Sequence, residues 1–415
     1  MNKMTNTFLN DSKVGDNPEE WEIVRLGDES IADLIMGQSP PSSTYNDKGI
    51  GLPFLQGNAE FGETYPAPIL SCSQPIKIAD KNDILLSVRA PVGDINIALS
   101  KSCIGRGLAA IRPKSDKLNY FFLYYYLKFG SRKFESLSMG STFKAIRKEE
   151  VVKFQIPLPP LPEQRRIAEV LGTVDSAIQK VGGGAIEGTE RLKKGLMQRL
   201  LTRGIGHERF KESEVGMVPE EWEAKTIGEI AKTSSGGTPS RDKKEYFIGS
   251  IPWVKSGELK DNTIYDTEET ITEKGLQNSS AKLFPKGTLL IALYGATVGK
   301  TSILGIDATT NQAVCAILSK KDLIDQKFLQ YFLISRRKQL ISISAGGAQP
   351  NISQEIIRLF KIPLPPLSEQ RRIAEMLSAV DRKLELERRR KEKLERVKKG
   401  LMNELLTGRK RVKVD

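Results

Sequence analysis

The chain has 415 residues, and its composition, 39% hydrophobic and 28% charged, is that of a globular protein. This length exceeds one ordinary hydrophobic core, so two or three domains are expected. Lysine and arginine exceed aspartate and glutamate by 64 − 51 = 13, and this excess favours anionic partners, nucleic acid before a membrane surface.

The sequence offers little for catalysis or for membrane insertion. No apolar run approaches the ~20 residues of a membrane span, and the first ten residues lack a signal-peptide core, so we expect a cytoplasmic protein. Three scattered cysteines provide neither a disulfide framework nor zinc-ligand spacing. A catalytic triad would need the single histidine, His207, whose glycine-containing surroundings are typical of an exposed linker.

An internal repeat divides the chain into two copies of one plan. The segment IPLPPLPEQRRIAEVL at Ile156 returns as IPLPPLSEQRRIAEML at Ile362, an offset of 362 − 156 = 206. Further on, KKGLMQRLLT at Lys193 returns as KKGLMNELLT at Lys398, an offset of 398 − 193 = 205. Both copies begin with PEEWE, and between these anchors the match is thin. Each copy therefore has a variable body of roughly 140 residues, enough for its own core, followed by a well-matched tail.

The two tails are predicted to be long helices that pair with each other. Proline disfavours helix in the residue before it, so helix begins near Pro162 in the first tail and near Ser368 in the second. Apolar residues then recur at the 4-3-4 spacing of a coiled-coil seam. The predicted seam comprises Ile167, Leu171, Val174, Ile178, Leu192 and Leu196 in the first tail, and Ile373, Leu377, Val380, Leu384, Leu394 and Leu401 in the second. The alternative, an amphipathic helix packed on its own domain, is disfavoured by the presence of two matched seams.

The first tail contains a stretch that disfavours helix. Residues 181–188 read VGGGAIEG, where the second tail is rich in arginine, lysine and glutamate. Each glycine costs roughly 0.5–1 kcal/mol relative to alanine in a helix. We therefore expect a weakened turn, a bulge or a hinge at 182–188.

One motif resembles a phosphate-binding loop. Residues 295–301 read GATVGKT after a strand-like segment, but three residues rather than four separate the glycines, and β-branched residues follow. The parallel stretch of the first half, RAPVGD, has no lysine. A turn between strands is the better interpretation. The sequence shows no methyltransferase tetrapeptide and no framed set of carboxylates, so neither a catalytic nor a metal site is predicted.

Basic and amide side chains recur in the glycine-containing loops of both bodies. Arginine and lysine suit phosphates and guanine edges, whereas asparagine and glutamine suit adenine. The candidate DNA-binding residues are Gln38, Ser39, Tyr45, Arg89, Arg106, Lys144 and Arg147 in the first body, and Thr238, Arg241, Lys255, Lys300, Gln312, Gln349 and Asn351 in the second. The alternative for each is an ordinary polar connection between strands.

The doubled PLPPL-x-EQRRIAE helix, the two dissimilar bodies and the KKGLM ending resemble a type I restriction–modification specificity subunit over nearly the whole chain. This resemblance implies an α+β fold with two target recognition domains of mixed α/β structure. It implies that two long helices separate them and form an antiparallel coiled coil, so that the internal repeat has pseudo-two-fold symmetry. The expected regions are 1–156 (first recognition domain), 157–204 (first helical region, with its break at 182–188), 205–361 (linker and second recognition domain) and 362–415 (second helical region and basic tail).

The resemblance also implies a function without catalysis by this chain. The expected partners are double-stranded DNA, two modification (methyltransferase) subunits and restriction subunits. No cofactor is expected here, and S-adenosylmethionine belongs to the adenine-methylating partner. Because the bodies differ, each should read a different half of a split target, with the helices setting the unread spacer. A self-contained enzyme and a stand-alone DNA-binding regulator remain alternatives, and the regulator would bind its site tightly without a methyltransferase.

Overall fold

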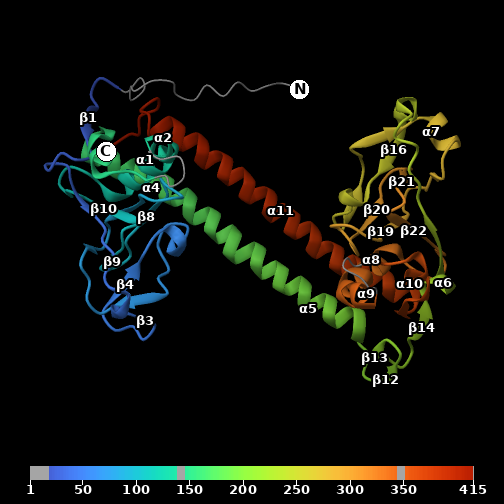
Figure 1. Cartoon of the computed structure of the whole chain (residues 1–415). Coiled ribbons are helices and arrows are strands. Elements are labelled where there is room, and N and C mark those ends of the chain that lie inside the picture. The colour runs from blue at the N-terminus through green and yellow to red at the C-terminus, as the bar shows by residue number, and fades with distance from the viewer. Residues whose placement is uncertain (1–17, 138–144, 344–350, 415) are drawn as a thin grey trace. The chain divides into compact units, whose positions relative to one another are not determined.

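The computed structural model describes residues 18–137, 145–343 and 351–414, and the chain divides into two compact units. Unit 1 consists of Met1–Gly182 with Arg389–Asp415, and unit 2 is Gly183–Arg388. Both boundaries fall within the helical tails (Figure 1). Each unit therefore contains one body, the first half of that body's own tail and the second half of the other tail.

In its described residues, the body of unit 1 contains two larger sheets and three short α-helices. One sheet is antiparallel with strand order β2-β10-β7-β8, and the other has the order β3-β5-β4-β9-β6 with β4 and β9 parallel. A separate pair, β1 and β11, joins the start of the body to its end. The strands are β1 (Glu22–Arg25), β2 (Ala32–Met36), β3 (Tyr45–Asn46), β4 (Leu52–Leu55), β5 (Leu70–Cys72), β6 (Ile78–Ala79), β7 (Ile84–Ser87), β8 (Ile95–Ile97), β9 (Ser102–Ile104), β10 (Leu108–Pro113) and β11 (Gln155–Leu158), and the helices are α1 (Tyr120–Phe129), α2 (Ser131–Leu137) and α3 (Lys148–Lys153).

The body of unit 2 repeats this connectivity with additions. Its larger sheet has the order β15-β22-β19-β20-β17, and its smaller sheet has the order β18-β16-β21 with β16 and β21 parallel. A hairpin, β12–β13, precedes the body, and β14 pairs with β23. The strands are β12 (Phe210–Ser213), β13 (Gly216–Pro219), β14 (Glu223–Thr226), β15 (Ala231–Ser235), β16 (Phe247–Val254), β17 (Asn262–Ile264), β18 (Glu269–Ile271), β19 (Leu289–Ala292), β20 (Thr301–Leu304), β21 (Thr309–Thr310), β22 (Val314–Ser319) and β23 (Lys361–Leu364), and the helices are α6 (Ile227–Ile230), α7 (Glu273–Gln277), α8 (Gln326–Ser335), α9 (Arg337–Ile343) and α10 (Gln354–Leu359).

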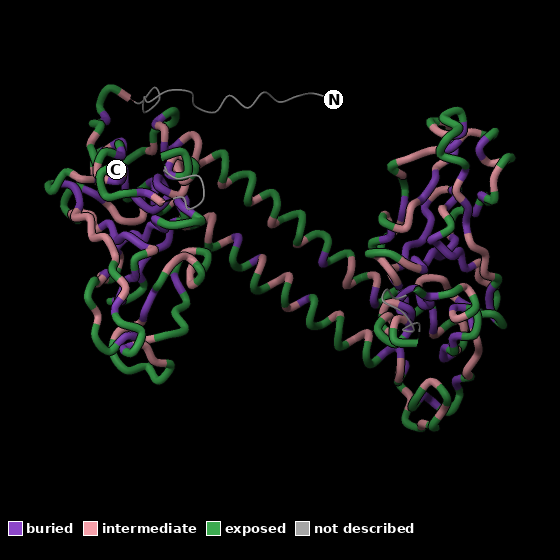
Figure 2. The backbone as a smooth tube through the Cα atoms, viewed as in Figure 1, coloured by how far each residue is buried: buried purple, intermediate pink, exposed green. Residues whose placement is uncertain are grey.

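A helix rich in buried aromatic residues anchors the core of each body. Buried residues gather inside both bodies (Figure 2). In unit 1 the Asn119 side chain caps α1 by accepting from the amides of Phe121 and Phe122, and in unit 2 Asp325 caps α8 by accepting from the amide of Phe328. Such caps satisfy amides that have no partner within the helix. Because the caps start both helices at corresponding places, the two cores share one plan although their side chains differ.

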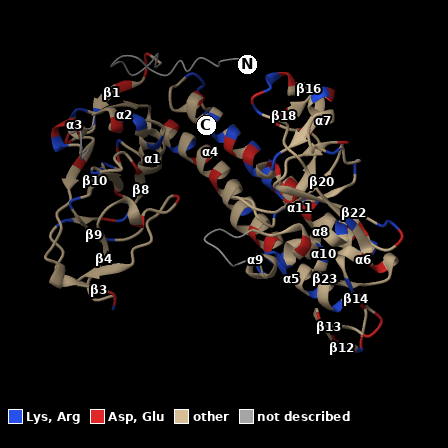
Figure 3. Cartoon of the chain, turned by 45° about the vertical axis from the view of Figure 1, so that its right-hand side comes forward, with Lys and Arg blue, Asp and Glu red and all other residues tan. Residues whose placement is uncertain are grey.

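The tail helices are α4 (Leu161–Gln179), the π-helical segment η3 (Lys180–Ile186), α5 (Glu187–Arg203) and the continuous α11 (Leu367–Leu405). The π-helical segment coincides with the glycine-rich stretch for which the sequence predicts a weakened turn or bulge. Along α11, acidic and basic positions are interspersed (Figure 3). No helix among the described residues has both the length and the apolar character needed to cross a membrane.

Within unit 1, α4 and the second half of α11 contact each other in opposite chain directions. Asp175 forms an ion pair with Lys398 and accepts a hydrogen bond of 2.8 Å from the Tyr125 hydroxyl, while Gly182 lies beside Lys391. As residue numbers rise along α4, those of their partners on α11 fall. The predicted seam residues Ile167, Leu171 and Ile178 are buried here, Val174 is half-buried, and Leu394 and Leu401 of α11 are half-buried.

The same contacts recur in unit 2 between α5 and the first half of α11. Lys193 pairs with Asp381 at 2.6 Å, Tyr331 donates to Asp381 at 2.7 Å, and Arg388 pairs with Glu190 at 2.6 Å. The predicted seam residues Ile373, Leu377 and Leu384 of α11 are buried, and Val380 and Leu196 are half-buried.

Leu192 departs from the predicted seam, because its side chain is 53% exposed. Thr189 is buried instead, and the next position on that face is Lys193, whose ammonium reaches Asp381. The π-helical segment upstream has more residues per turn than an α-helix, so the buried face is displaced relative to an uninterrupted 4-3-4 pattern.

His207 is not the exposed linker residue that its neighbours predict. Its side chain is only 14% exposed, and its Nε2 lies 2.9 Å from Glu369 Oε1. The Glu369 carboxylate also accepts from the indole of Trp222 at 3.0 Å and from the amide of Ile205 at 2.8 Å. The glycines next to His207 form a tight turn, in which Gly204 has φ +64°. This turn packs against Glu369 at the start of α11.

Unit 1 builds the corresponding cluster from the end of the chain. Glu163 accepts from the Trp21 indole at 3.2 Å and from two nitrogens of Arg411, Nε at 2.7 Å and Nη2 at 2.9 Å. The glutamate of each repeated EQRR motif therefore binds the tryptophan of the PEEWE segment in its own unit. A third group completes each cluster, Arg411 in unit 1 and His207 in unit 2.

Alanine substitutions at two sets of glycines are expected to have opposite effects on stability. An added Cβ at Gly183 or Gly184 has no neighbour within 4 Å, so G183A/G184A should stabilise the helix by about 1–2 kcal/mol in total. At Gly204 the added Cβ would lie 2.4 Å from Glu369 Oε1 in a left-handed backbone, so G204A should destabilise the chain. Urea unfolding of both variants tests this, and a lower midpoint for G183A/G184A would contradict it.

Candidate nucleic-acid interface

Five loops of the first body meet at one place, and we name them loop cluster 1: residues 37–39, 55–57, 88–89, 105–107 and 145–147. Backbone hydrogen bonds join them in sequence. Gln38 donates to Ile104 at 3.1 Å, Gly105 to Leu55 at 2.8 Å, Val88 to Gly107 at 2.9 Å, and Ile146 to Val88 at 2.9 Å. The Ser39 hydroxyl accepts from the Arg106 amide at 3.1 Å. Gln38, Ser39, Arg89, Arg106 and Arg147, which are far apart in sequence, are thereby brought together.

The second body contains the same arrangement, loop cluster 2: residues 236–241, 254–256, 293–294, 310–313 and 351–353. Gly237 donates to Thr310 at 2.9 Å, Asn311 to Val254 at 2.9 Å, Leu293 to Ala313 at 2.8 Å, and Ile352 to Leu293 at 2.8 Å. Each bond has a counterpart in loop cluster 1. Corresponding positions carry different side chains: Gln38 and Gly237, Ser39 and Thr238, Arg89 and Tyr294, Arg106 and Gln312, Ala145 and Asn351, and Arg147 and Ser353.

The glycine that opens each cluster is required by close backbone approach. A Cβ at Gly37 would lie 2.2 Å from the Gly105 carbonyl oxygen, and one at Gly236 would lie 2.3 Å from the Thr310 carbonyl oxygen. The repeated Gly-x-Ser/Thr-Pro segments therefore hold the first loop of each cluster against the loop after β9 or β21. The backbone of the next two residues, 38–39 in the first body and 237–238 in the second, is therefore restrained.

The guanidinium groups of loop cluster 1 are available to an anionic ligand. Arg89, Arg106 and Arg147 are exposed, and among the described residues no carboxylate forms an ion pair with any of them. Tyr45 lies just beside the cluster: its ring stacks on Phe54 at 4.4 Å, its hydroxyl donates to the Pro40 carbonyl at 2.7 Å, and burial raises its pKa. Lys144 lies outside the described residues.

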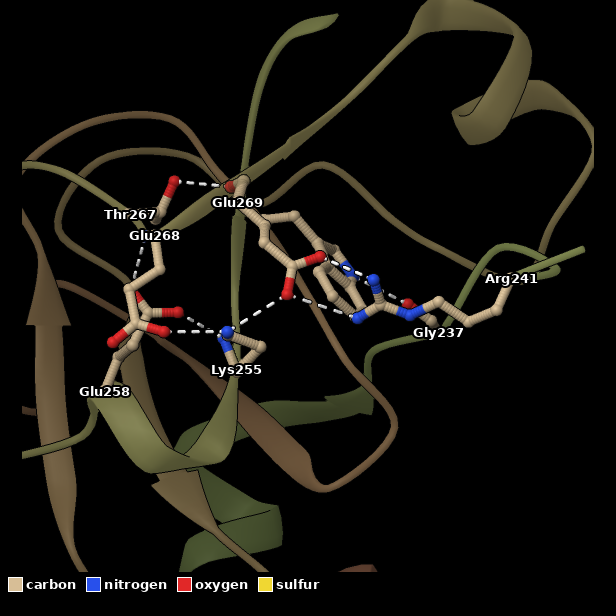
Figure 4. A network of polar contacts seen from close by, with 8 residues as sticks. Gly237, Arg241, Lys255, Glu258, Thr267, Glu268 and Glu269 are labelled. Carbon is tan, nitrogen blue, oxygen red and sulfur yellow. Dashed lines mark hydrogen bonds and ion pairs between the residues drawn. The ribbon is translucent and has the colours of Figure 1, made fainter. Parts of the chain in front are cut away.

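In loop cluster 2 the cations are not free. Arg241 forms an ion pair with Glu269 at 2.6 Å, and Lys255 pairs with Glu268 at 2.7 Å and with Glu269 at 3.0 Å (Figure 4). The hydrogen bonds from Arg241 lower the pKa of Glu269, and those from Lys255 lower the pKa of Glu268. All of these groups therefore stay charged near neutral pH. This network partly neutralises two of the positive charges that the sequence assigns to DNA binding.

The remaining candidates of the second body are dispersed. Thr238 donates to the Gln312 side chain within loop cluster 2, and Asn351 is exposed at its edge. Gln349 lies outside the described residues. Lys300 belongs to a separate turn, and its backbone amide donates to Thr297 at 2.9 Å.

The segment that resembles a phosphate-binding loop is this same turn. It joins the antiparallel strands β19 and β20, with Gly295 and Gly299 at positive φ, and a strand rather than a helix follows. Phosphate-binding loops of the P-loop class need a helix N-terminus at that point. The turn between strands expected from the sequence is therefore confirmed.

Sequence reasoning missed three residues that shape loop cluster 2. Glu268 and Glu269 were not candidates because acidic side chains repel phosphates, so a search for basic and amide groups passes over them. Trp253 has no sequence signal of its own, but its indole donates to the Gly237 carbonyl at 3.0 Å and its ring lies 5.0 Å from the Arg241 guanidinium. Its counterpart in the first body is Phe54, since Phe54 aligns with Cys103 and Trp253 with Thr309 in the two parallel strand pairs.

Comparison with known proteins agrees with this duplicated architecture. The type I restriction modification DNA specificity domain matches the chain twice, at residues 18–183 and 219–396. The type I restriction enzyme MjaVIII specificity subunit of Methanocaldococcus jannaschii is 30% identical over 407 residues, which is 95% of this chain and 94% of that protein. The putative MjaX specificity subunit of the same organism is 51% identical over 194 residues, and this match spans only 47% of the chain and 45% of the relative.

The fold is also known from a solved structure. The S subunit of a type I restriction-modification system from M. genitalium superposes with a TM-score of 0.62 over 94% of this chain and 96% of that one, at 18% sequence identity. The two family matches and the full-length relative together show that the chain belongs to the type I restriction-modification DNA specificity family.

Proposed function

We propose that this chain is the DNA specificity subunit of a type I restriction–modification complex and has no catalytic activity of its own. Loop clusters 1 and 2 each read one half of a bipartite target on double-stranded DNA. The observation that carries this proposal is the repeated backbone frame with different side chains at corresponding positions, such as Arg106 and Gln312. Arginine favours guanine and glutamine favours adenine, so the two half-sites differ in sequence.

The paired helices provide the spacing between the half-sites. Opposite chain directions within each unit, and the matched ion pairs of Asp175 with Lys398 and of Asp381 with Lys193, support an antiparallel coiled coil with pseudo-two-fold symmetry. The recognition domains then correspond to 1–156 and 205–361, and the helical regions to 157–204 and 362–415. Because the distance between the two recognition domains is fixed, the two half-sites are separated by a spacer of defined length whose bases are not recognised.

The helical regions and the adjoining faces of the bodies dock the partners. Two modification subunits, each carrying S-adenosylmethionine, bind the chain, with one subunit at each repeat. Restriction subunits then join this complex. This stoichiometry follows from the duplication, because each repeat offers one copy of the same docking elements.

Methylation mapping tests the proposed function directly. The chain is co-expressed with a candidate modification subunit, and methylated adenines in host DNA are located by sequencing. We expect a split, asymmetric motif that appears only when both proteins are present. The absence of new methylation from a complex that co-purifies intact would contradict the proposal.

A substitution in loop cluster 1 is expected to alter one half of that motif. R106Q introduces the residue found at the corresponding position of loop cluster 2, and a lost arginine–guanine contact changes discrimination by about 1–3 kcal/mol. The control is K81Q, an exposed position at the other end of β7 from loop cluster 1. Changes in both halves of the motif for R106Q, or in either half for K81Q, would contradict the assignment.

A further inference from the structure

The acidic residues beside loop cluster 2 form a network that links two of its loops. Glu269 lies at the start of β18, outside the cluster, and is directly opposite Trp253 of β16. Residues directly opposite in an antiparallel pair project on the same face of the sheet. The Arg241 guanidinium contacts both the Glu269 carboxylate and the Trp253 ring. Figure 4 shows its contact with Glu269.

The Arg241 guanidinium is held on several sides. Nη1 donates to Glu269 at 2.6 Å and Nη2 donates at 3.3 Å, so the two groups interact in a fork. The group also lies over the ring of Phe247 at 4.6 Å and over that of Trp253 at 5.0 Å. Cation–π contact with two rings and a forked carboxylate contact together define the plane of the guanidinium. Its side chain is nevertheless 54% exposed, and a guanidinium has five donors, so donors remain for a ligand.

The same carboxylate also holds Lys255. Lys255 Nζ lies 3.0 Å from Glu269 Oε1 and 2.7 Å from Glu268 Oε2. The backbone at Lys255 is fixed by Glu258, which accepts from the Lys255 amide at 2.8 Å and from the Glu268 amide at 3.1 Å. The Glu269 side chain thus contacts both Arg241 and Lys255 of loop cluster 2, whereas the Glu268 side chain forms an ion pair with Lys255 and none with Arg241 among the described residues.

We propose that Glu269 is a specificity-determining positioning residue: it orients Arg241 and Lys255 for contact with base edges in the half-site that the second body reads. This inference rests on the proposed function. The network argues against a role in general phosphate attraction. Its two cations and three glutamates sum to +2 − 3 = −1, which repels a DNA backbone. A fixed arginine plane, in contrast, is what bidentate pairing with a guanine edge requires.

Loop cluster 1 shows what the network adds. Its exposed arginines, Arg89, Arg106 and Arg147, have no ion-pair partner in the described part of the chain, so no carboxylate there orients them before DNA binds. The second body therefore depends on Glu269 for the geometry of its cations, whereas the corresponding position of the first body, opposite Phe54, is the apolar Leu70.

The test measures sequence discrimination by the complete complex with its modification subunit. Methylation rates are compared for the mapped target and for duplexes with single-base changes in either half-site. In E269Q the carboxylate charge is lost while the side chain keeps its size. We expect the discrimination within the second half-site to fall roughly 5- to 150-fold, the value of one bidentate base contact. Discrimination within the first half-site should be unchanged, and E269D should restore part of the loss.

The matched control is E268Q, since the Glu268 side chain pairs with Lys255 but not with Arg241 in the described part of the chain, and it is 69% exposed. Its effect on discrimination should be smaller than that of E269Q. An equal loss of rate on all duplexes together with a lower melting temperature would show a merely structural role and would overturn the proposal. Unchanged discrimination in E269Q, with a normal wild-type complex, would overturn the role of Glu269 alone. A wild-type complex that methylates no split motif would overturn the proposed function and this inference with it.

Discussion

The substitution R411A is expected to destabilise unit 1 by about 1–3 kcal/mol. Arg411 donates two hydrogen bonds to Glu163, whose side chain is only 3% exposed. These bonds, and a further one to Glu20, raise the pKa of the Arg411 guanidinium. Without Arg411 the buried Glu163 carboxylate keeps the Trp21 indole as a donor but loses its only cationic partner among the described residues. An uncompensated buried charge is far more costly than a missing surface pair.

Urea unfolding of the full chain measures this loss, and hydrogen exchange localises it to unit 1. Lys410 provides the control, because its side chain is 74% exposed and K410A should change stability by less than about 0.5 kcal/mol. The double variant R411A/E163Q should recover part of the loss, since it removes the buried charge as well. A loss below 1 kcal/mol for R411A would mean that water or a neighbouring group replaces the guanidinium.

The substitution W253A should destabilise unit 2 by about 3–5 kcal/mol. The Trp253 side chain is 2% exposed and packs with Ile251, Ile271 and Ala281, so truncation leaves a large cavity. It also removes the donor to the Gly237 carbonyl and one of the rings beneath Arg241. Loop cluster 2 should therefore lose both its support and the orientation of its arginine.

The first body provides the matched control, because Phe54 occupies the corresponding position. W253F keeps an aromatic core and loses only the indole donor and some volume, so we expect a loss of about 1–2 kcal/mol. Chemical denaturation and methylation of the second half-site should both rank wild type, W253F and W253A in that order. A W253A variant that unfolds at the wild-type midpoint would contradict the packing described for this residue.

The duplication could be deduced from the sequence, because its strongest signals are local. The EQRR motif fulfils the same two tasks in each unit. Its glutamates bind Trp21 and Trp222, and its glutamines, Gln164 and Gln370, accept from the amides of the residues that cap α1 and α8. Such a constraint preserves both residues in both copies, and the repeat reveals the family. The membership predicted from these motifs is confirmed.

Interactions between residues adjacent in sequence also predict where the tail helices begin and where the first of them departs from α-helical geometry. Two consecutive prolines directly before each helix keep the chain extended there. The start of α4 at Leu161 therefore lies within one residue of the expected Pro162, and the start of α11 at Leu367 within one residue of Ser368. Four glycines weaken a helix whatever surrounds it, and the π-helical segment lies at that stretch. The mixed α/β character of the bodies, in contrast, is expected only from the resemblance to the family.

Contacts between distant residues could not be deduced in this way. The glycines next to His207 in the sequence are typical of a linker. Its partner Glu369 lies 162 residues further along the chain, so local sequence does not reveal their contact. Leu192 fitted the apolar spacing, but the π-helical segment shifted the buried face to Thr189 and Lys193.

The candidate DNA-binding residues divide in the same manner. Sequence by itself determined the duplicated plan, the tail helices and the residue types suited to DNA, since these depend on composition and on close neighbours. Only the tertiary structure decided which loops meet and which cations are already bound: Arg106 is without an ion-pair partner among the described residues, while Arg241 is held by Glu269. The physical reason is that side-chain electrostatics depend on distance in space, and strand pairing sets that distance between residues that are remote in sequence.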